Sequence, residues 1–201
     1  MSLFSFQTIK EAVEGFYKEK GSKFMAFAYP VESEEEVKEK VVDLKKKYFD
    51  GRHHCFAYML GVDKARFRAF DDGEPNHSAG DPILGQIKSK NLTNVLIVVV
   101  RYFGGKKLGV SGLIQAYKIA AGDALSHAEI IEKEKESITL RYPYESTPEV
   151  MRLVKEFGVE ILEQDFVKDC YLKANLKNKI QIEFMSRLHL LQALGNKIVL
   201  E

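Results

Sequence analysis

The sequence has few cysteines and almost no net charge. Cys55 and Cys170 are the only cysteines in 201 residues, and their separation does not match the spacing of a zinc motif. Two distant thiols are typical of a reduced cytosolic protein, so we expect a cytoplasmic location. Lys and Arg number 30 against 29 Asp and Glu, a net charge of +1. Proteins that bind nucleic acid over their whole surface normally carry a larger basic excess, so any site for a polyanion has to be a local patch.

Long apolar runs are absent as well. The longest, VLIVVV at 95–100, is far too short to span a bilayer. The opening stretch MSLFSFQTIKEAVEG lacks the basic region and apolar core of a secretory signal. We therefore expect no membrane association. The length suits one large domain or two small ones.

Strands and helices alternate in the N-terminal part of the chain. Ser33 and Glu36 form a capping-box pattern at the start of one helix, whose apolar residues recur at helical spacing. The expected helices are 33–49, a short one after residue 82, and one from Ser111 or Gly112 to about His127. The expected strands are 21–31, 54–60, 65–70 and 94–100.

The C-terminal part has a different pattern. A strand at 137–144, a helix, a hairpin, a second helix from about Gln181 and a closing strand follow one another. This order, βαββαβ, is the split pattern of a ferredoxin-like domain. The charged stretch EKEKES at 132–137 precedes it. We expect an α+β fold with two domains, 1–136 and 137–201.

A glycine-rich loop follows the longest apolar run. In RYFGGKKLGVSGLIQAY, at 101–117, glycines let backbone N–H groups approach a ligand, and the next helix offers unpaired amides at its start. Lys106 and Lys107 add charge, and Arg101 adds a fork for phosphate. The alternative is a plain turn, with Ser111 capping the helix. The residues expected to bind an anion or nucleic acid are Arg101, Tyr102, Phe103, Gly104, Gly105, Lys106, Lys107, Gly109 and Ser111, with Arg52 and His53.

Aromatic residues accompany this loop. Tyr102 and Phe103 are candidates for stacking on the bases of a nucleic acid, and Arg52, Arg66 and Arg68 for contacting its phosphate backbone. The alternative is that one ring belongs to the core and the other covers the loop. The loop fits neither the phosphate-binding nor the dinucleotide-binding glycine pattern, so it indicates no particular nucleotide.

The loop DDGEPNHSAGDP at 71–82 is rich in acids. Asp71, Asp72, Glu74 and Asp81 are candidates for holding magnesium or for acid–base chemistry. The alternative is a series of turns whose carboxylates pair with nearby Arg and Lys. We predict no metal and no other cofactor.

Two histidines stand before Cys55. Adjacent residues on a strand point to opposite faces, so His53 and Cys55 share a side and His54 does not. Two ligands do not make a zinc site. We expect the histidine near Arg101 to be packed or hydrogen-bonded rather than metal-bound.

Three phrases together resemble one family. GRHHCFAYML, DDGEPNHSAGDPILGQI and NVLIVVVRYFGGKKLGVSGLIQAY are similar to the signature of the IMPACT/YigZ family, over about residues 15–130. Asn76, His77 and Ser78 depart from it, because a Ser-Gly-Thr-like run is more usual there. The resemblance implies an N-terminal domain like the second domain of ribosomal protein S5. In the bacterial YigZ branch it also implies a ferredoxin-like tail similar to the fifth domain of elongation factor G.

The resemblance further implies a role near translation. The leading hypothesis is a non-enzymatic, translation-linked regulatory protein that binds RNA or the ribosome through the glycine-rich basic loop. A second hypothesis is a nucleotide- or phosphate-binding enzyme that uses the loop together with Asp71, Asp72 and Glu74. A third is a protein-interaction module, in which the sheet of the tail docks on a protein partner in translation.

Overall fold

The computed structural model describes residues 5–62, 64–134, 137–166, 169–176 and 180–201. The chain forms two compact units, one of Phe6–Lys133 and the other chiefly of Glu134–Glu201. Each unit has an apolar core of its own. No helix in the described ranges has the length and apolar character needed to cross a membrane.

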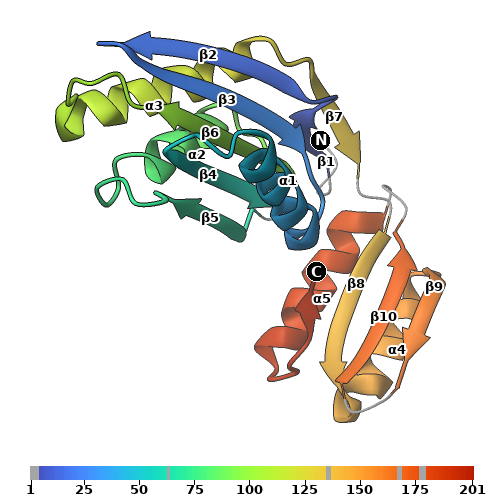
Figure 1. Cartoon of the computed structure of the whole chain (residues 1–201). Helices are drawn as coiled ribbons and strands as arrows, with labels where there is room; N and C mark the ends of the chain where they lie inside the picture. The colour runs from blue at the N-terminus through green and yellow to red at the C-terminus, as the bar shows by residue number, and fades with distance from the viewer. Residues whose placement is uncertain (1–4, 63, 135–136, 167–168, 177–179) are drawn as a thin grey trace. The chain divides into compact units, whose positions relative to one another are not determined.

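A five-stranded antiparallel sheet organises the first unit (Figure 1). Its strands lie in the order β2-β3-β6-β4-β5. Their bounds are β2 Val13–Glu19, β3 Ser22–Pro30, β4 His53–Leu60, β5 Arg66–Phe70 and β6 Val95–Tyr102. The strands predicted at 21–31, 54–60, 65–70 and 94–100 correspond to β3, β4, β5 and β6. β2 was not predicted.

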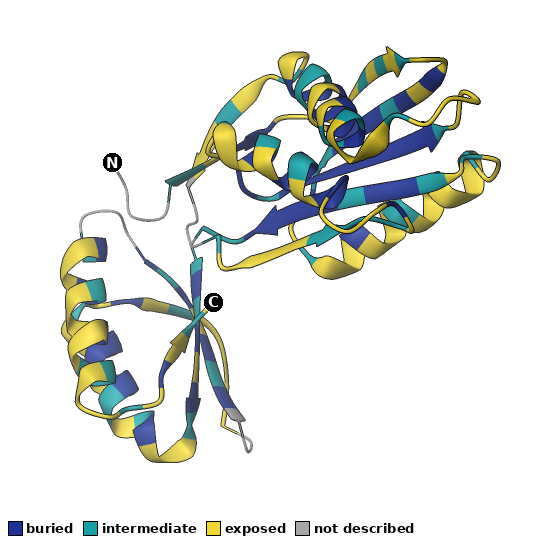
Figure 2. Cartoon of the chain, turned by 90° about the vertical axis from the view of Figure 1, so that its left-hand side faces the viewer, coloured by how far each residue is buried: buried dark blue, intermediate teal, exposed yellow. Residues whose placement is uncertain are grey.

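Helices cover both faces of this sheet, as Figure 1 shows. Helix α1 packs on one face, and α2 and α3 pack on the other. Their bounds are α1 Glu34–Lys47, α2 Gly80–Ser89 and α3 Gly109–Ser126. Along β6, Val95, Ile97 and Val99 enter the core beneath α2 and α3, whereas Leu96, Val98 and Val100 enter the core beneath α1. Burial on both faces explains the unbroken apolar run (Figure 2).

The predicted capping box is present at the start of α1. The Ser33 hydroxyl accepts a hydrogen bond from the Glu36 N–H at 3.2 Å. The Glu36 carboxylate in turn accepts from the N–H of Glu32 at 2.9 Å, one residue before the cap. Both bonds satisfy donors that the helix itself leaves unpaired.

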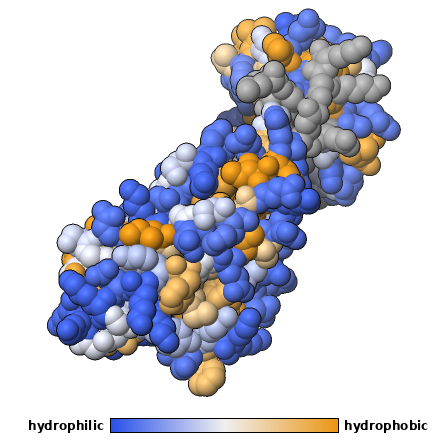
Figure 3. Space-filling model, turned by 90° about the horizontal axis from the view of Figure 1, so that it is seen from above, coloured by the Kyte–Doolittle hydropathy of each residue, from blue (hydrophilic) through white to orange (hydrophobic). Residues whose placement is uncertain are grey.

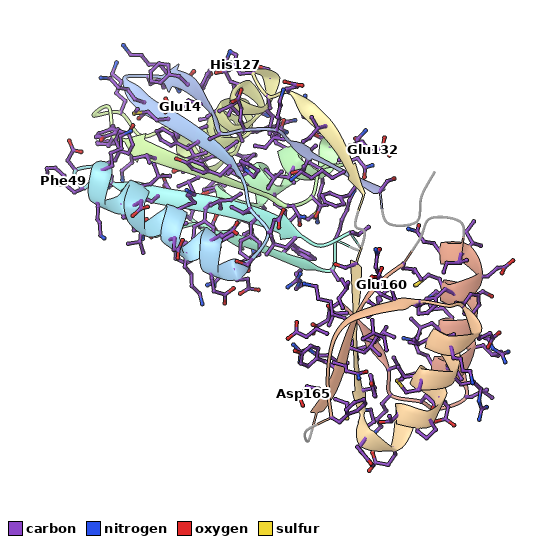
Figure 4. All side chains as sticks on the ribbon, turned by 90° about the vertical axis from the view of Figure 1, so that its right-hand side faces the viewer. Glu14, Phe49, His127, Glu132, Glu160 and Asp165 are labelled. Carbon is purple, nitrogen blue, oxygen red and sulfur yellow. The ribbon has the colours of Figure 1, made fainter. Side chains whose placement is uncertain are left out.

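Helix α3 lies against β2 along its C-terminal half. A Cβ at Gly15 on β2 would stand 2.2 Å from the Ala124 nitrogen, so only glycine permits this close approach. Just after α3, the His127 ring contacts the Glu14 carbonyl at 3.1 Å, and Figure 4 labels both residues. This packing holds α3, and therefore its N-terminal end, rigidly against the sheet.

A small second sheet in the first unit was not predicted. It pairs β1, Ser5–Ile9, with β7, Ile130–Glu134. β7 overlaps the charged stretch at 132–137, where we predicted the boundary between the domains. Charged side chains are compatible with a strand whose faces are open to solvent, so the charge run did not distinguish the two structures.

The second unit has the predicted order of elements. These are β8 Ser137–Pro143, a short 3₁₀ turn at Tyr144–Ser146, α4 Thr147–Glu156, β9 Glu160–Asp165, β10 Asp169–Asn175, α5 Gln181–Ala193 and β11 Val199–Leu200. The antiparallel sheet has the order β11-β8-β10-β9, in which β9 and β10 form the predicted hairpin. This is the split βαβ arrangement. Both helices contribute to the core on one face of the sheet.

Candidate functional site: a cavity at the start of α3

A cavity of about 490 Å³ lies in the first unit where β4, β6, the acidic loop and α3 meet. Its lining comes from four segments, 52–53, 73–75, Arg101 with Phe103, and 107–110 with Leu113. Small-molecule sites typically occupy roughly 300–1,000 Å³. Part of the predicted anion-binding set therefore meets Glu74 at one cavity of suitable size. The members that line it are Arg52, His53, Arg101, Phe103, Lys107 and Gly109, whereas Tyr102, Gly104, Gly105, Lys106 and Ser111 do not.

Arg101 and Glu74 form the inner wall of the cavity. The alternation along β6 directs Arg101 toward the α3 side, and the sheet register places His53 directly beside it. Arg101 Nη1 lies 2.5 Å from Glu74 Oε1, and the Tyr117 hydroxyl donates to the same oxygen at 2.9 Å. His53 Nε2 lies 3.9 Å from this oxygen. The charge of Arg101 is thus balanced inside the protein, which corrects the expectation of an open fork for phosphate.

Arg101 also contacts two aromatic rings. Its guanidinium carbon lies 5.5 Å from the centroid of Phe24 and 5.8 Å from that of Phe103. Such cation–π contacts stabilise a buried guanidinium. Its Nε is buried without a described hydrogen-bond partner. The residue is held in place by packing and by Glu74, so it shapes the wall of the cavity.

Behind this wall, Tyr117 and Cys55 continue the polar network. The Cys55 thiol donates to the Asp71 carbonyl at 2.9 Å and approaches the Tyr117 hydroxyl at 3.3 Å. Burial raises the pKa of the Cys55 thiol, although the Tyr117 hydroxyl opposes this shift. Burial, then Cys55 and Glu74, raise the pKa of Tyr117. Both shifts favour the protonated forms, so Cys55 serves as a hydrogen-bond donor within this network.

The acids of the 71–82 loop serve separate structural roles. The Asp71 carboxylate accepts the N–H groups of Ala79 and Gly80 at 3.0 and 2.8 Å, which caps the start of α2. Asp72 accepts the His54 N–H at 2.7 Å and contacts Lys45 at 3.1 Å. Across the described ranges, no group of three or more His, Cys, Asp or Glu residues could hold a metal ion. Asp71, Asp72 and Glu74 therefore do not gather at one point. The fourth acid of the loop, Asp81, lies 2.6 Å from Nδ1 of His77.

The two histidines point to opposite faces, as predicted. His53 lines the cavity, on the side of the sheet that Cys55 also faces. Its Nδ1 lies 2.8 Å from the Asp72 carbonyl. His54 is buried on the other side, where burial lowers its pKa against the opposing effect of Asp72. The expectation of a hydrogen-bonded His53 is confirmed.

The glycines of the loop differ in what they do. The Gly104 N–H donates to the Ser22 hydroxyl at 3.1 Å, and a Cβ there would stand 1.9 Å from the carbonyl carbon of Gly21. Gly104 therefore permits close packing of two chain segments. Gly105 and Gly109 have φ of +84° and +75° and face open space. These two allow the sharp turn that leads into α3.

The start of α3 has no side-chain cap. The helix begins at Gly109, and the residue before it, Leu108, makes no capping hydrogen bond. Ser111 lies inside the first turn, so its predicted role as the cap was wrong. Leu108, Gly109 and Val110 line the cavity, so the start of the helix lies at it, and a helix start favours an anion. Lys107 lines the cavity, whereas the neighbouring Lys106 does not.

The two aromatic residues after Arg101 separate to opposite faces. The Tyr102 hydroxyl donates to Asp50 at 2.8 Å, and its ring packs on the α1 side of the sheet. Phe103 lines the cavity, is 44% exposed and lies 5.7 Å from the guanidinium carbon of Arg52. Of the two rings, only Phe103 is at the cavity. Arg66 and Arg68 lie on the edge strand β5 and do not line it.

Tyr117 was missed by the sequence reasoning. It stands on the inner face of α3, two turns into the helix, and is fully buried. Its hydroxyl links Glu74 to Cys55, two residues far from it in the sequence. The helical spacing Leu113, Ala116, Tyr117, Ala120 would have marked it as a core-facing polar side chain in need of a partner.

Comparison with known proteins shows which family of proteins this chain is similar to. Residues 20–125 match the family model of the Impact N-terminal domain. The IMPACT family member YvyE of Bacillus subtilis is 38% identical over 132 residues, 66% of this chain but only 61% of that protein, less than two thirds of its length. The IMPACT family member YigZ of Escherichia coli is 30% identical over 172 residues, 84% of either chain.

A solved structure described as that of a hypothetical protein has the same fold. Its TM-score is 0.70 at 27% sequence identity, and the alignment covers 99% of this chain and 97% of that one. The family match contains every segment that lines the cavity. The chain therefore belongs to the IMPACT family.

Proposed function

We propose that this chain is a non-enzymatic, translation-linked regulatory protein that binds RNA or the ribosome at the cavity of its first unit. The observation that carries the proposal is the uncapped start of α3 beside Lys107 and Arg52 in one cavity. Helix amides and cationic side chains together favour a phosphate group. Phe103 at the rim adds a ring on which a base can stack.

The rest of the surface supports a local rather than a broad contact. Acids and bases are balanced over the whole chain. On the face shown in Figure 3, apolar side chains form separate patches within a hydrophilic surface. A long-range field of one sign is therefore not available to attract RNA, so affinity has to come from a few phosphate contacts at the cavity.

Two adjacent lysines provide the test. Lys107 lines the cavity and Lys106 does not, although both are exposed and their removal changes the net charge equally. RNA binding is measured over a range of salt for wild type, Lys107→Ala and Lys106→Ala. Lys107→Ala should weaken binding and reduce the salt slope by about one. Equal effects of the two substitutions, or none, would contradict binding at the cavity.

A second candidate function is a nucleotide- or phosphate-binding enzyme. The volume of the cavity, about 490 Å³, favours it because that volume suits a small ligand. A thermal-shift screen with nucleotides decides between the two. Saturation with a true ligand at 100 times its Kd stabilises by about 2.7 kcal/mol, whereas RNA binding alone predicts no shift with free nucleotides.

The fold relationships belong to the same proposal. We infer that the first unit is similar to the second domain of ribosomal protein S5, and the second unit to the fifth domain of elongation factor G. The helix-covered antiparallel sheet and the βαββαβ order support this. The second unit would then serve as a docking module for a protein partner in translation. A pull-down with each unit expressed separately tests which one makes that contact.

A further inference from the structure

Glu74 presents an unused acceptor to the cavity. Its Oε1 takes the donors of Arg101 and Tyr117, whereas no donor among the described residues reaches Oε2. The Glu74 side chain is 4% exposed, and the residue lines the cavity. This oxygen keeps some contact with solvent, so a ligand in the cavity can reach it. This oxygen is therefore suited to a ligand that brings an O–H or N–H group.

His53 adds a second acceptor in the same part of the cavity lining. A carbonyl oxygen can only accept, so the 2.8 Å contact with the Asp72 carbonyl places the proton of a neutral His53 ring on Nδ1. Nε2 then has a free lone pair, and it lies 3.9 Å from Glu74 Oε1 on the cavity side. The buried part of the lining thus offers Glu74 and His53 as acceptors beside the Arg101 donor, whereas Lys107 and Arg52 are exposed lining residues.

A ligand that fits both sets of lining residues carries hydroxyl donors and an anionic group. An ammonium donor is disfavoured at Glu74, because Arg101 already supplies the positive charge that this carboxylate needs. A ribose with a phosphate meets both requirements. Resting on the proposed function, we infer that the cavity binds a ribonucleotide, with the ribose 2′-hydroxyl donating to Glu74 Oε2. The 2′-hydroxyl is the group that separates RNA from DNA, so Glu74 sets the preference for RNA.

The test compares three single-stranded oligonucleotides of one sequence, with RNA, DNA and 2′-O-methyl RNA backbones. The methylated strand keeps the 2′ oxygen but cannot donate a hydrogen bond. Binding is followed by fluorescence anisotropy with the full-length chain. Wild type should bind RNA about ten-fold more tightly than either other strand. Adenosine monophosphate and its 2′-deoxy form are measured in parallel, which distinguishes a free nucleotide from a nucleotide within a chain.

Glu74→Gln tests the assigned atom. Arg101 and Tyr117 both donate to one oxygen, so the amide has to turn its carbonyl toward them and its NH₂ group toward the cavity. The variant should no longer distinguish RNA from 2′-O-methyl RNA, because an NH₂ group cannot accept from the 2′-hydroxyl and can donate to the 2′ oxygen of either strand. A preference that persists in Glu74→Gln would overturn the assignment to Glu74.

The wild-type measurements stand even if this variant fails to fold. Equal binding of the ribose and deoxyribose forms would overturn the hydroxyl contact. The proposed function would survive that result if Lys107→Ala still weakened binding. Absence of binding to every strand and to both nucleotides would overturn the ribose contact and the proposed function together.

Discussion

Arg101 and Glu74 form a buried ion pair, with Nη1 and Oε1 2.5 Å apart and both side chains less than a tenth exposed. Desolvation of two charges is costly, so such a pair contributes little net stability, yet removal of one partner leaves the other charge buried without compensation. This relationship links the end of β6 to the acidic loop and defines the inner wall of the cavity.

Removal of one partner should therefore be strongly destabilising. Glu74→Ala should reduce the free energy of unfolding by about 3–5 kcal/mol, measured by urea denaturation. Lys10→Ala breaks the exposed pair with Glu129 and should leave the free energy of unfolding almost unchanged, because solvent screens this pair. Similar losses for the two variants would show that the Arg101–Glu74 pair is not shielded from water.

Substitution of two glycines by alanine should change the stability of the protein in opposite directions. At Gly104 a Cβ would stand 1.9 Å from the Gly21 carbonyl carbon, so Gly104→Ala should cost about 1–3 kcal/mol of stability through overpacking. At the exposed Gly85, inside α2, nothing lies within 4 Å of the added Cβ. Gly85→Ala should stabilise the protein by about 0.5–1 kcal/mol through helix propensity. The thermal unfolding temperatures of the two variants test both predictions. A stabilised Gly104→Ala would contradict the close packing of Gly104 against Gly21.

The Cys55 thiol should resist chemical modification in the folded protein. Burial raises its pKa, so the reactive thiolate stays scarce at a pH where an exposed cysteine is already partly ionised. A Cys170→Ala variant leaves Cys55 as the only thiol, and its reaction with a disulfide reagent is followed at pH 8 with and without urea. We expect slow reaction in buffer and fast reaction in urea. Fast reaction in buffer would contradict the burial of Cys55 and its contacts with Asp71 and Tyr117.

Local patterns in the sequence predicted most of the fold. The capping box at Ser33 marked α1, and the unbroken apolar run before Arg101 marked the buried central strand, because both signals depend on residues near one another in the chain. β2 and β7 were missed because their charged residues resemble loop sequence, and pairing with a distant strand decides their structure.

The candidate site was less predictable for the same reason. The strand period correctly placed His53 on the side of Cys55. The strand period did not reveal that Glu74 would neutralise Arg101, because this contact joins a loop to the end of a strand and no local pattern predicts it. The glycine loop suggested a cluster of free cations, and the structure leaves Lys107 and Arg52 at the cavity instead.

Stability should fall in mild acid because of His54. Burial lowers its pKa in the folded protein, so the unfolded state binds the proton more readily. The stabilising contribution of the neutral ring is fully present above the unfolded pKa of about 6.5 and is lost as pH falls below it. Urea denaturation between pH 5 and 8 should show this decline, and His54→Leu should reduce its slope. His189→Gln, at an exposed position on α5, is the matched control and should leave the slope unchanged. An identical decline in His54→Leu and wild type would assign the acid sensitivity to other groups.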